Sequence, residues 1–98
     1  MLKLHVTPKA ESDLVNIWLY SCEEWGLDQA DKYLDLLEMG MKQLLNHPLL
    51  GANYSYVLQG YRRLQIEHHA VFYQVLEPEI RVVRVLHEDM DAPQRLLD

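Results

Sequence analysis

The sequence has little that would hold a secreted or membrane protein together. Its one cysteine, Cys22, cannot form an intrachain disulfide, which favours a reducing compartment. No apolar run is long enough to span a bilayer, and the first residues, MLKLHVTPKAESD, lack the continuous apolar segment of a signal peptide. We therefore expect a cytoplasmic protein with no membrane partner.

Positive charge is also scarce. The formal net charge is −6, residues 9–42 hold eight acidic side chains against three lysines, and no arginine precedes Arg62. Proteins that grip nucleic acids usually carry a basic surplus. This charge balance disfavours direct nucleic-acid binding.

The first half of the chain predicts a strand and a helical hairpin. Apolar and polar residues alternate over 2–6, as in a half-buried strand. Thr7 and Pro8 then form a helix start, Gly26 a stop, and Asp28 a cap for a second helix that ends before Pro48. The short connection predicts antiparallel helices.

The second half predicts three strands, at residues 61–67, 69–76 and 80–87, after a surface loop at 47–60. The tight turn EPE joins the last two strands, and residues 91–98 are left as a frayed turn or short helix. The resulting order, β-α-α-β-β-β, predicts one α+β domain over residues 1–98, with a helical hairpin packed on one face of a mainly antiparallel sheet. The other sheet face would then be uncovered, and we expect an exposed apolar patch there, formed by Val71, Tyr73, Val83 and Val85.

Two histidine-based sites can be considered. His68 and His69 would point to opposite faces of a strand and cannot both ligate one ion, so we expect no metal and no cofactor. If the EPE turn pairs Val75 with Arg81, one sheet face collects a cluster that resembles a ribonuclease site, consisting of His69, Tyr73, Arg81 and His87. A shift of one residue would disperse this cluster, and the many nearby acids oppose binding of a polyanion.

The remaining conspicuous side chains favour structural roles. Trp18, Trp25 and Tyr33 are predicted in the core, and Cys22 as a small packing residue.

Arg81 and Arg84 should face opposite ways on their strand. We expect Arg84 to be structural, beside Val82 and Leu86, and Arg81 to face a partner together with His87.

Six segments in chain order resemble the ParE branch of the ParE/RelE superfamily of toxin–antitoxin modules. They are TPKAESDL, WGLDQADKYL, NHPLLG, GYRRL, HAVFYQV and IRVVRVLHEDMD. The resemblance implies a bacterial toxin that inhibits DNA gyrase by binding, without catalytic residues, and a ParD-like antitoxin that neutralises it. The implied partner-binding residues are Arg62, Arg63, His69, Tyr73, Arg81, Arg84, His87 and Met90.

The chain also departs from the ParE pattern. Gln65 and Glu67 stand where ParE-like chains often have Pro and Gly, and Ala52 and Leu58 replace common basic residues. Two alternatives therefore stay open: a RelE-like ribosome-dependent messenger-RNA endoribonuclease, and a non-toxic relative that only binds antitoxin.

Overall fold

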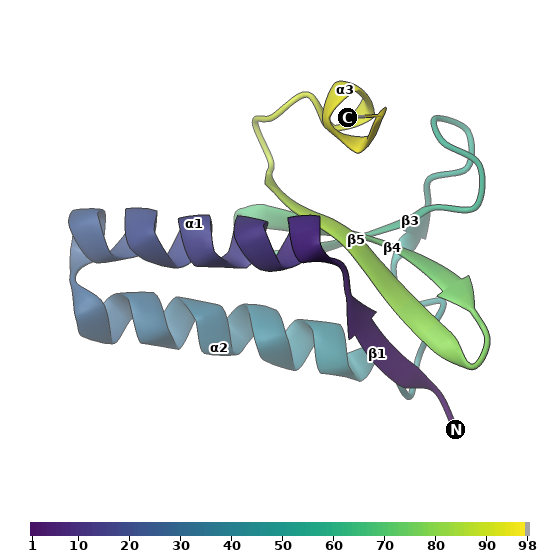
Figure 1. Cartoon of the computed structure of the whole chain (residues 1–98), viewed down its shortest axis with the longest axis horizontal. Coiled ribbons are helices and arrows are strands. Elements are labelled where there is room, and N and C mark those ends of the chain that lie inside the picture. The colour runs from purple at the N-terminus through teal and green to yellow at the C-terminus, as the bar shows by residue number, and fades with distance from the viewer. Residues whose placement is uncertain (98) are drawn as a thin grey trace.

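A five-stranded mixed sheet carries a long helical hairpin on one face and a short C-terminal helix on the other (Figure 1). This computed structural model describes residues 1–97. The strand order is β1-β5-β4-β3-β2, with β1 parallel to β5 and every other pair antiparallel. The α+β architecture predicted from the sequence is confirmed.

The strand β1 (Lys3–Val6) and the helix α1 (Pro8–Trp25) meet at Thr7. The Thr7 hydroxyl accepts a hydrogen bond from the Ala10 N–H at 3.2 Å and donates one to the Val83 carbonyl at 2.9 Å. The predicted helix cap is therefore confirmed, and the same side chain also ties the start of α1 to the edge of the sheet.

Gly26 alone separates α1 from α2 (Leu27–Gln43). It adopts a φ of 91°, which favours glycine, and its N–H donates to the Cys22 carbonyl. The prediction that Asp28 caps the second helix is wrong, because Gly26 occupies the cap position and Asp28 lies in the first turn.

The C-terminal strands are β3 (Arg62–Ile66), β4 (His69–Leu76) and β5 (Glu79–His87). A two-residue strand that the sequence did not predict, β2 (Ala52–Asn53), pairs with β3 from within the predicted loop.

The pairing of Val75 with Arg81, on which the ribonuclease-like cluster depended, does not form: Val75 pairs with Ile80, a shift of one residue. Further along, Tyr73 pairs with Val82 and Phe72 with Arg84, so Val83 is an extra residue on β5. This β-bulge reverses the facing of the residues that follow it. Arg81 and Arg84 consequently lie on the same face, contrary to the prediction.

Both faces of the sheet are covered. Val71, Tyr73 and Val85 are buried under the hairpin, while Val83 is half-buried. The opposite face carries a second core, formed by Tyr54, Ala70, Phe72, Leu86 and Leu96. The predicted exposed patch is therefore wrong, because Tyr54 from the 47–60 loop and the helix α3 (Ala92–Leu97) cover the second face. Of the two alternatives that the sequence left for the C-terminal residues, the short helix is present over 92–97, and Asp98 lies outside the described residues.

The two tryptophans are less buried than the sequence predicted. Trp25 is 62% exposed. Trp18 is half-buried and donates its indole N–H to Asp31 at 2.8 Å. Tyr33, also predicted in the core, is half-buried beside two histidines. Within residues 1–97, no helix combines the length and apolar character needed to cross a membrane.

Candidate partner-binding groove

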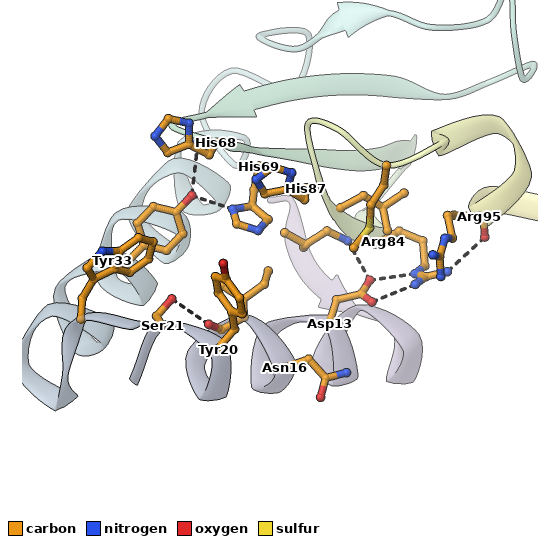
Figure 2. A pocket seen from close by; sticks show the side chains of 15 residues that line it. Asp13, Asn16, Tyr20, Ser21, Tyr33, His68, His69, Arg84, His87 and Arg95 are labelled. Atoms are coloured by element: carbon orange, nitrogen blue, oxygen red, sulfur yellow. Dashed lines mark hydrogen bonds and ion pairs between the residues drawn. The ribbon is translucent and has the colours of Figure 1, made fainter. Parts of the chain in front are cut away.

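A groove of about 560 Å³ lies between α1 and the last part of β5 (Figure 2). It forms because β1 pairs with β5 only as far as Val82, so that α1 runs directly beside the next part of β5. The hairpin also projects beyond the sheet, as Figure 1 shows, and Tyr20 and Trp25 in the distal part of α1 are exposed.

Asp13 on α1 forms hydrogen bonds with β5 beyond the point where the pairing of β5 with β1 ends. Its carboxylate accepts two hydrogen bonds from the Arg84 guanidinium, at 2.7 and 2.8 Å, and one from the Val85 N–H at 3.0 Å. The two charged side chains are only 13% and 14% exposed. Such a bidentate, charge-assisted pair is among the stronger polar contacts in proteins. Arg84 also donates to the Arg95 carbonyl at 3.0 Å, so the pair links α1, β5 and α3.

Tyr33 and two histidines form the inner wall. The Tyr33 oxygen lies 2.6 Å from Nδ1 of His69 and accepts a hydrogen bond from the His68 N–H (Figure 2). The rings of His69 and His87 pack edge to face at 5.2 Å.

Burial, followed by the neighbouring His87 and His68, lowers the pKa of His69 from 6.5 to about 4. The pKa of Tyr33 is raised, first by burial. His69 is therefore neutral near pH 7, and its Nδ1 shares a hydrogen bond with the Tyr33 hydroxyl.

The outer part of the groove is aromatic and apolar. Tyr20 and Trp25 pack edge to face at 6.2 Å and are 59% and 62% exposed, and Met90 is 44% exposed. Exposed aromatic side chains beside a concavity are typical anchors for a protein partner.

The opposite end of the groove is basic. A second cavity of about 430 Å³ shares Asp13, Asn16, Arg84 and Arg95 with the first. It adds Lys9 and Ser12 from the start of α1. The two cavities therefore adjoin along α1, with the Asp13–Arg84 pair in the lining of both.

Four of the predicted site residues line this groove: His69, Arg84, His87 and Met90. Arg62 instead donates to the carbonyls of Gly51 and Leu49, and so holds the loop after α2. Arg63 bonds to Gln65 and lies 6.0 Å from the centre of the Phe72 ring. Neither arginine belongs to the groove lining.

The ribonuclease-like cluster that one strand register would have formed does not assemble. Tyr73 is fully buried, where its hydroxyl donates to the Pro48 carbonyl and accepts from the Gly51 N–H, so it is not available to a partner at the surface. Arg81 pairs with Glu79 on the sheet face opposite His87, because of the bulge. Of the four residues, only His69 and His87 come together.

Sequence reasoning missed much of the groove. Asp13, Asn16, Ile17, Tyr20 and Ser21 recur at helical spacing and line it from α1. That periodicity was visible, but it could not separate a groove-facing stripe from a core-facing one. Among residues 1–97, no group of three or more metal-ligating side chains is close enough to hold a metal ion.

Comparison with known proteins identifies the family of this chain. Residues 4–92 match the model of a family described as the ParE toxin of the type II toxin–antitoxin system parDE. This chain belongs to the ParE toxin family.

Curated ParE toxins are similar over nearly their whole length. The chain is 37% identical to Toxin ParE1 of Mycobacterium tuberculosis over 92 residues, which cover 93% of this chain and 94% of the relative. It is 34% identical to Toxin ParE1 of Caulobacter vibrioides over 96 residues, covering 98% and 99% of the two chains.

A solved structure of a chromosomal ParDE toxin–antitoxin system from P. aeruginosa has the same fold. Its TM-score is 0.80 at 26% identity, with 89% of this chain and 96% of that chain covered. The ParE fold and the toxin–antitoxin assignment from the sequence are confirmed.

Proposed function

We propose that this ParE toxin inhibits DNA gyrase by binding and is neutralised by a ParD-like antitoxin that occupies the groove along α1. The family description and the P. aeruginosa structure both name ParD with ParE in one system, which supports an antitoxin partner. Because gyrase acts on the chromosome, the proposed site of action is the cytoplasm. The observation that carries the binding site is the groove with exposed Tyr20, Trp25 and Met90 at one end.

A binding role fits these side chains better than RNA cleavage. A ribonuclease needs a general base, a general acid and a cation near the developing phosphorane. Arg84, which lines the groove with the histidines, is already held by Asp13, and His68 is hydrogen-bonded to Glu88 at 2.9 Å. We therefore propose that toxicity does not depend on catalysis.

Induction of the toxin alone tests the target. We expect filamentous cells, gyrase-dependent DNA breaks and intact messenger RNA, and we expect the purified protein to inhibit supercoiling by gyrase. Cuts in ribosome-bound messages that His87→Ala abolishes would make the ribonuclease the primary function. Normal growth with antitoxin binding retained would identify a non-toxic, antitoxin-binding relative.

Substitutions at two neighbouring residues on α1 test whether the antitoxin binds in the groove. Tyr20 lines it, whereas Leu19 is 49% exposed and does not. We expect Tyr20→Lys to weaken binding of a ParD-like antitoxin by about tenfold or more, because aromatic anchors carry much of the energy of an interface. Leu19→Lys should bind normally. Calorimetry measures both affinities, and co-expression with the partner should raise the solubility of the unaltered chain.

Equal binding by the two variants would show that the groove is not part of the antitoxin interface. A matched melting curve for each variant separates lost binding from lost folding.

A further inference from the structure

The turn that follows β5 is held by the last residue of the strand, His87. The Asp89 N–H donates a hydrogen bond to Nδ1 of the His87 ring at 3.1 Å, and the Met90 N–H donates one to the His87 carbonyl at 3.0 Å. Met90 lines the groove from this turn, together with the His87 ring. The place of Met90 in the groove therefore depends on two hydrogen bonds to one histidine.

The bond to the ring requires that Nδ1 of His87 carry no proton. A backbone N–H can only donate, so Nδ1 must keep its lone pair, and the neutral ring then carries its proton on Nε2. Protonation of Nδ1 would turn this acceptor into a donor, and the bond from the Asp89 N–H would be lost. The Asp89 carboxylate lies 3.7 Å from the same nitrogen and is 88% exposed, so it can turn towards the ring and accept the new N–H.

The surroundings of His87 in the groove stabilise a positive charge only weakly. His69 packs against it from β4, with 5.2 Å between the ring centres (Figure 2). Burial lowers the pKa of His69 from 6.5 to about 4, so this neighbour stays neutral. Glu88, the next residue of the chain, is hydrogen-bonded to His68 at 2.9 Å.

The helices beside the ring supply little opposite charge. Among the described residues of the lining, the other titratable side chains are Asp13 and Tyr20 of α1, Tyr33 of α2, Arg84 of β5 and Arg95 of α3. Asp13 is the one carboxylate in that set, and it is paired with Arg84. The carboxylate that a charged His87 gains is therefore that of Asp89, in the turn itself.

We propose that His87 is a proton-sensitive switch for the groove: its neutral ring holds the turn that places Met90 against a bound antitoxin, and its protonation opens this turn and weakens binding. The inference rests on the proposed function and adds regulation by pH to the same site. Histidine is suited to this role because its charge changes between about pH 5 and 8.

The direction of the effect follows from the chemistry of the groove. Ile17, Val85 and Leu86 contribute apolar surface to the lining, so a bound segment would cover the His87 ring in largely apolar surroundings. Removing a charged group from water is unfavourable unless the group is paired. The free toxin can therefore bind a proton that the complex excludes, and acid favours the free toxin.

A neutral replacement separates the charge of His87 from its hydrogen bond. In His87→Asn, the amide oxygen lies as many bonds from the backbone as Nδ1 and can accept from the Asp89 N–H, but the side chain cannot be protonated. His87→Gln serves as a second neutral variant. The matched control is His47→Asn, because His47 is exposed and does not line the groove.

Each toxin is titrated with the same purified ParD-like antitoxin at pH 7.5 and 5.5, and circular dichroism at both values confirms that the toxin is folded. The lower pH lies above the pKa of about 4 of His69, so His69 stays neutral in both measurements. We expect the unaltered toxin and His47→Asn to bind about five- to tenfold more weakly at pH 5.5, since excluding one proton costs at most about tenfold in affinity per pH unit.

The loss of affinity in acid should be about five- to tenfold smaller for His87→Asn. Titratable groups of the antitoxin act equally on every toxin, so the difference between the variants isolates His87.

A second measurement follows the turn in the toxin alone. With labelled methionine methyl groups, the NMR signal of Met90 is identified by its absence in Met90→Leu. We expect this signal to shift between pH 7.5 and 5.5 in the unaltered toxin and in His47→Asn, and to stay in place in His87→Asn.

The outcomes separate this inference from the proposed function. Equal pH dependence of antitoxin binding in the unaltered toxin and in His87→Asn would overturn the switch and leave the antitoxin partner in place. A Met90 signal that moves equally in these two proteins would also overturn it, because the turn would then respond to another group. Absence of antitoxin binding at pH 7.5 would overturn the proposed partner and the regulatory role, even if the Met90 signal still followed His87.

Discussion

The two halves of β5 differ in which element forms hydrogen bonds with their outer edge. From Glu79 to Val82 the neighbour is β1, which forms a parallel ladder with it. Beyond the bulge at Val83 the neighbour is a helix, and the carboxylate of Asp13 accepts the Val85 N–H in place of a strand. An unpaired strand edge invites association with other chains. Here a side chain from α1 caps the edge, and the space beside it forms the groove.

The comparison shows that one strand serves as both scaffold and binding surface. In its first half, Ile80 and Val82 are fully buried under the hairpin. In its second half, Arg84 and His87 line the groove. The extra residue Val83 divides these functions, because it changes which side chains face the hairpin.

The strongest test of this division is to remove the cap. Asp13→Ala should lower the free energy of unfolding by about 3 kcal/mol, because it removes the Asp13 carboxylate from the largely buried Arg84 and the acceptor from the Val85 N–H. Urea denaturation followed by circular dichroism measures the loss.

Asp13→Asn should be intermediate, since its amide oxygen can still accept one hydrogen bond. A loss below about 1 kcal/mol for Asp13→Ala would mean that the second half of β5 needs no cap from α1.

Acidification should lower the free energy of unfolding through His69, which lines the groove. Because the pKa of His69 falls from 6.5 in the unfolded chain to about 4 in the folded one, the unfolded state binds more protons between these values. The stability from neutral His69 is thus complete above pH 6.5 and is lost as the pH falls towards 4.

We expect a loss of about 2 kcal/mol between pH 6.5 and 4.5, measured by denaturation at each pH. The variant His69→Gln should show a flatter profile over the same window. Parallel profiles for the two proteins would assign the loss to other groups.

The smallest effect is expected at the exposed arginine before the bulge. Arg81 pairs with Glu79 at 2.9 Å, but the two side chains are 44% and 31% exposed, so solvent screens the pair and Arg81→Ala should change the free energy of unfolding by less than about 0.5 kcal/mol. Arg84→Ala should cost about 2 kcal/mol, because it removes a shielded pair. Similar melting temperatures for the two variants would contradict the expectation that the arginine in the second half of β5 contributes more to stability than the one in the first half.

The sequence by itself determined the local elements. Thr7 and Pro8 start α1, Gly26 ends it at a left-handed φ, and alternating apolar residues mark the strands. These signals act within a few residues, through caps, turns and side-chain period, so they can be recognised without knowing the fold. The ordered motifs of the chain also identified the ParE family, which the comparisons confirm.

Only the tertiary structure decided the sheet faces and the groove. The bulge at Val83 places Arg81 and His87 on opposite faces of the sheet, because one extra residue exchanges the faces of all residues that follow it. No local sequence pattern indicates this bulge. The Asp13–Arg84 pair joins residues 71 positions apart, and Tyr33 reaches His69 across 36. Contacts of that separation exist only once α1 and α2 have packed against the sheet, because the packing angle of the hairpin determines which helical stripe faces the core and which lines the groove.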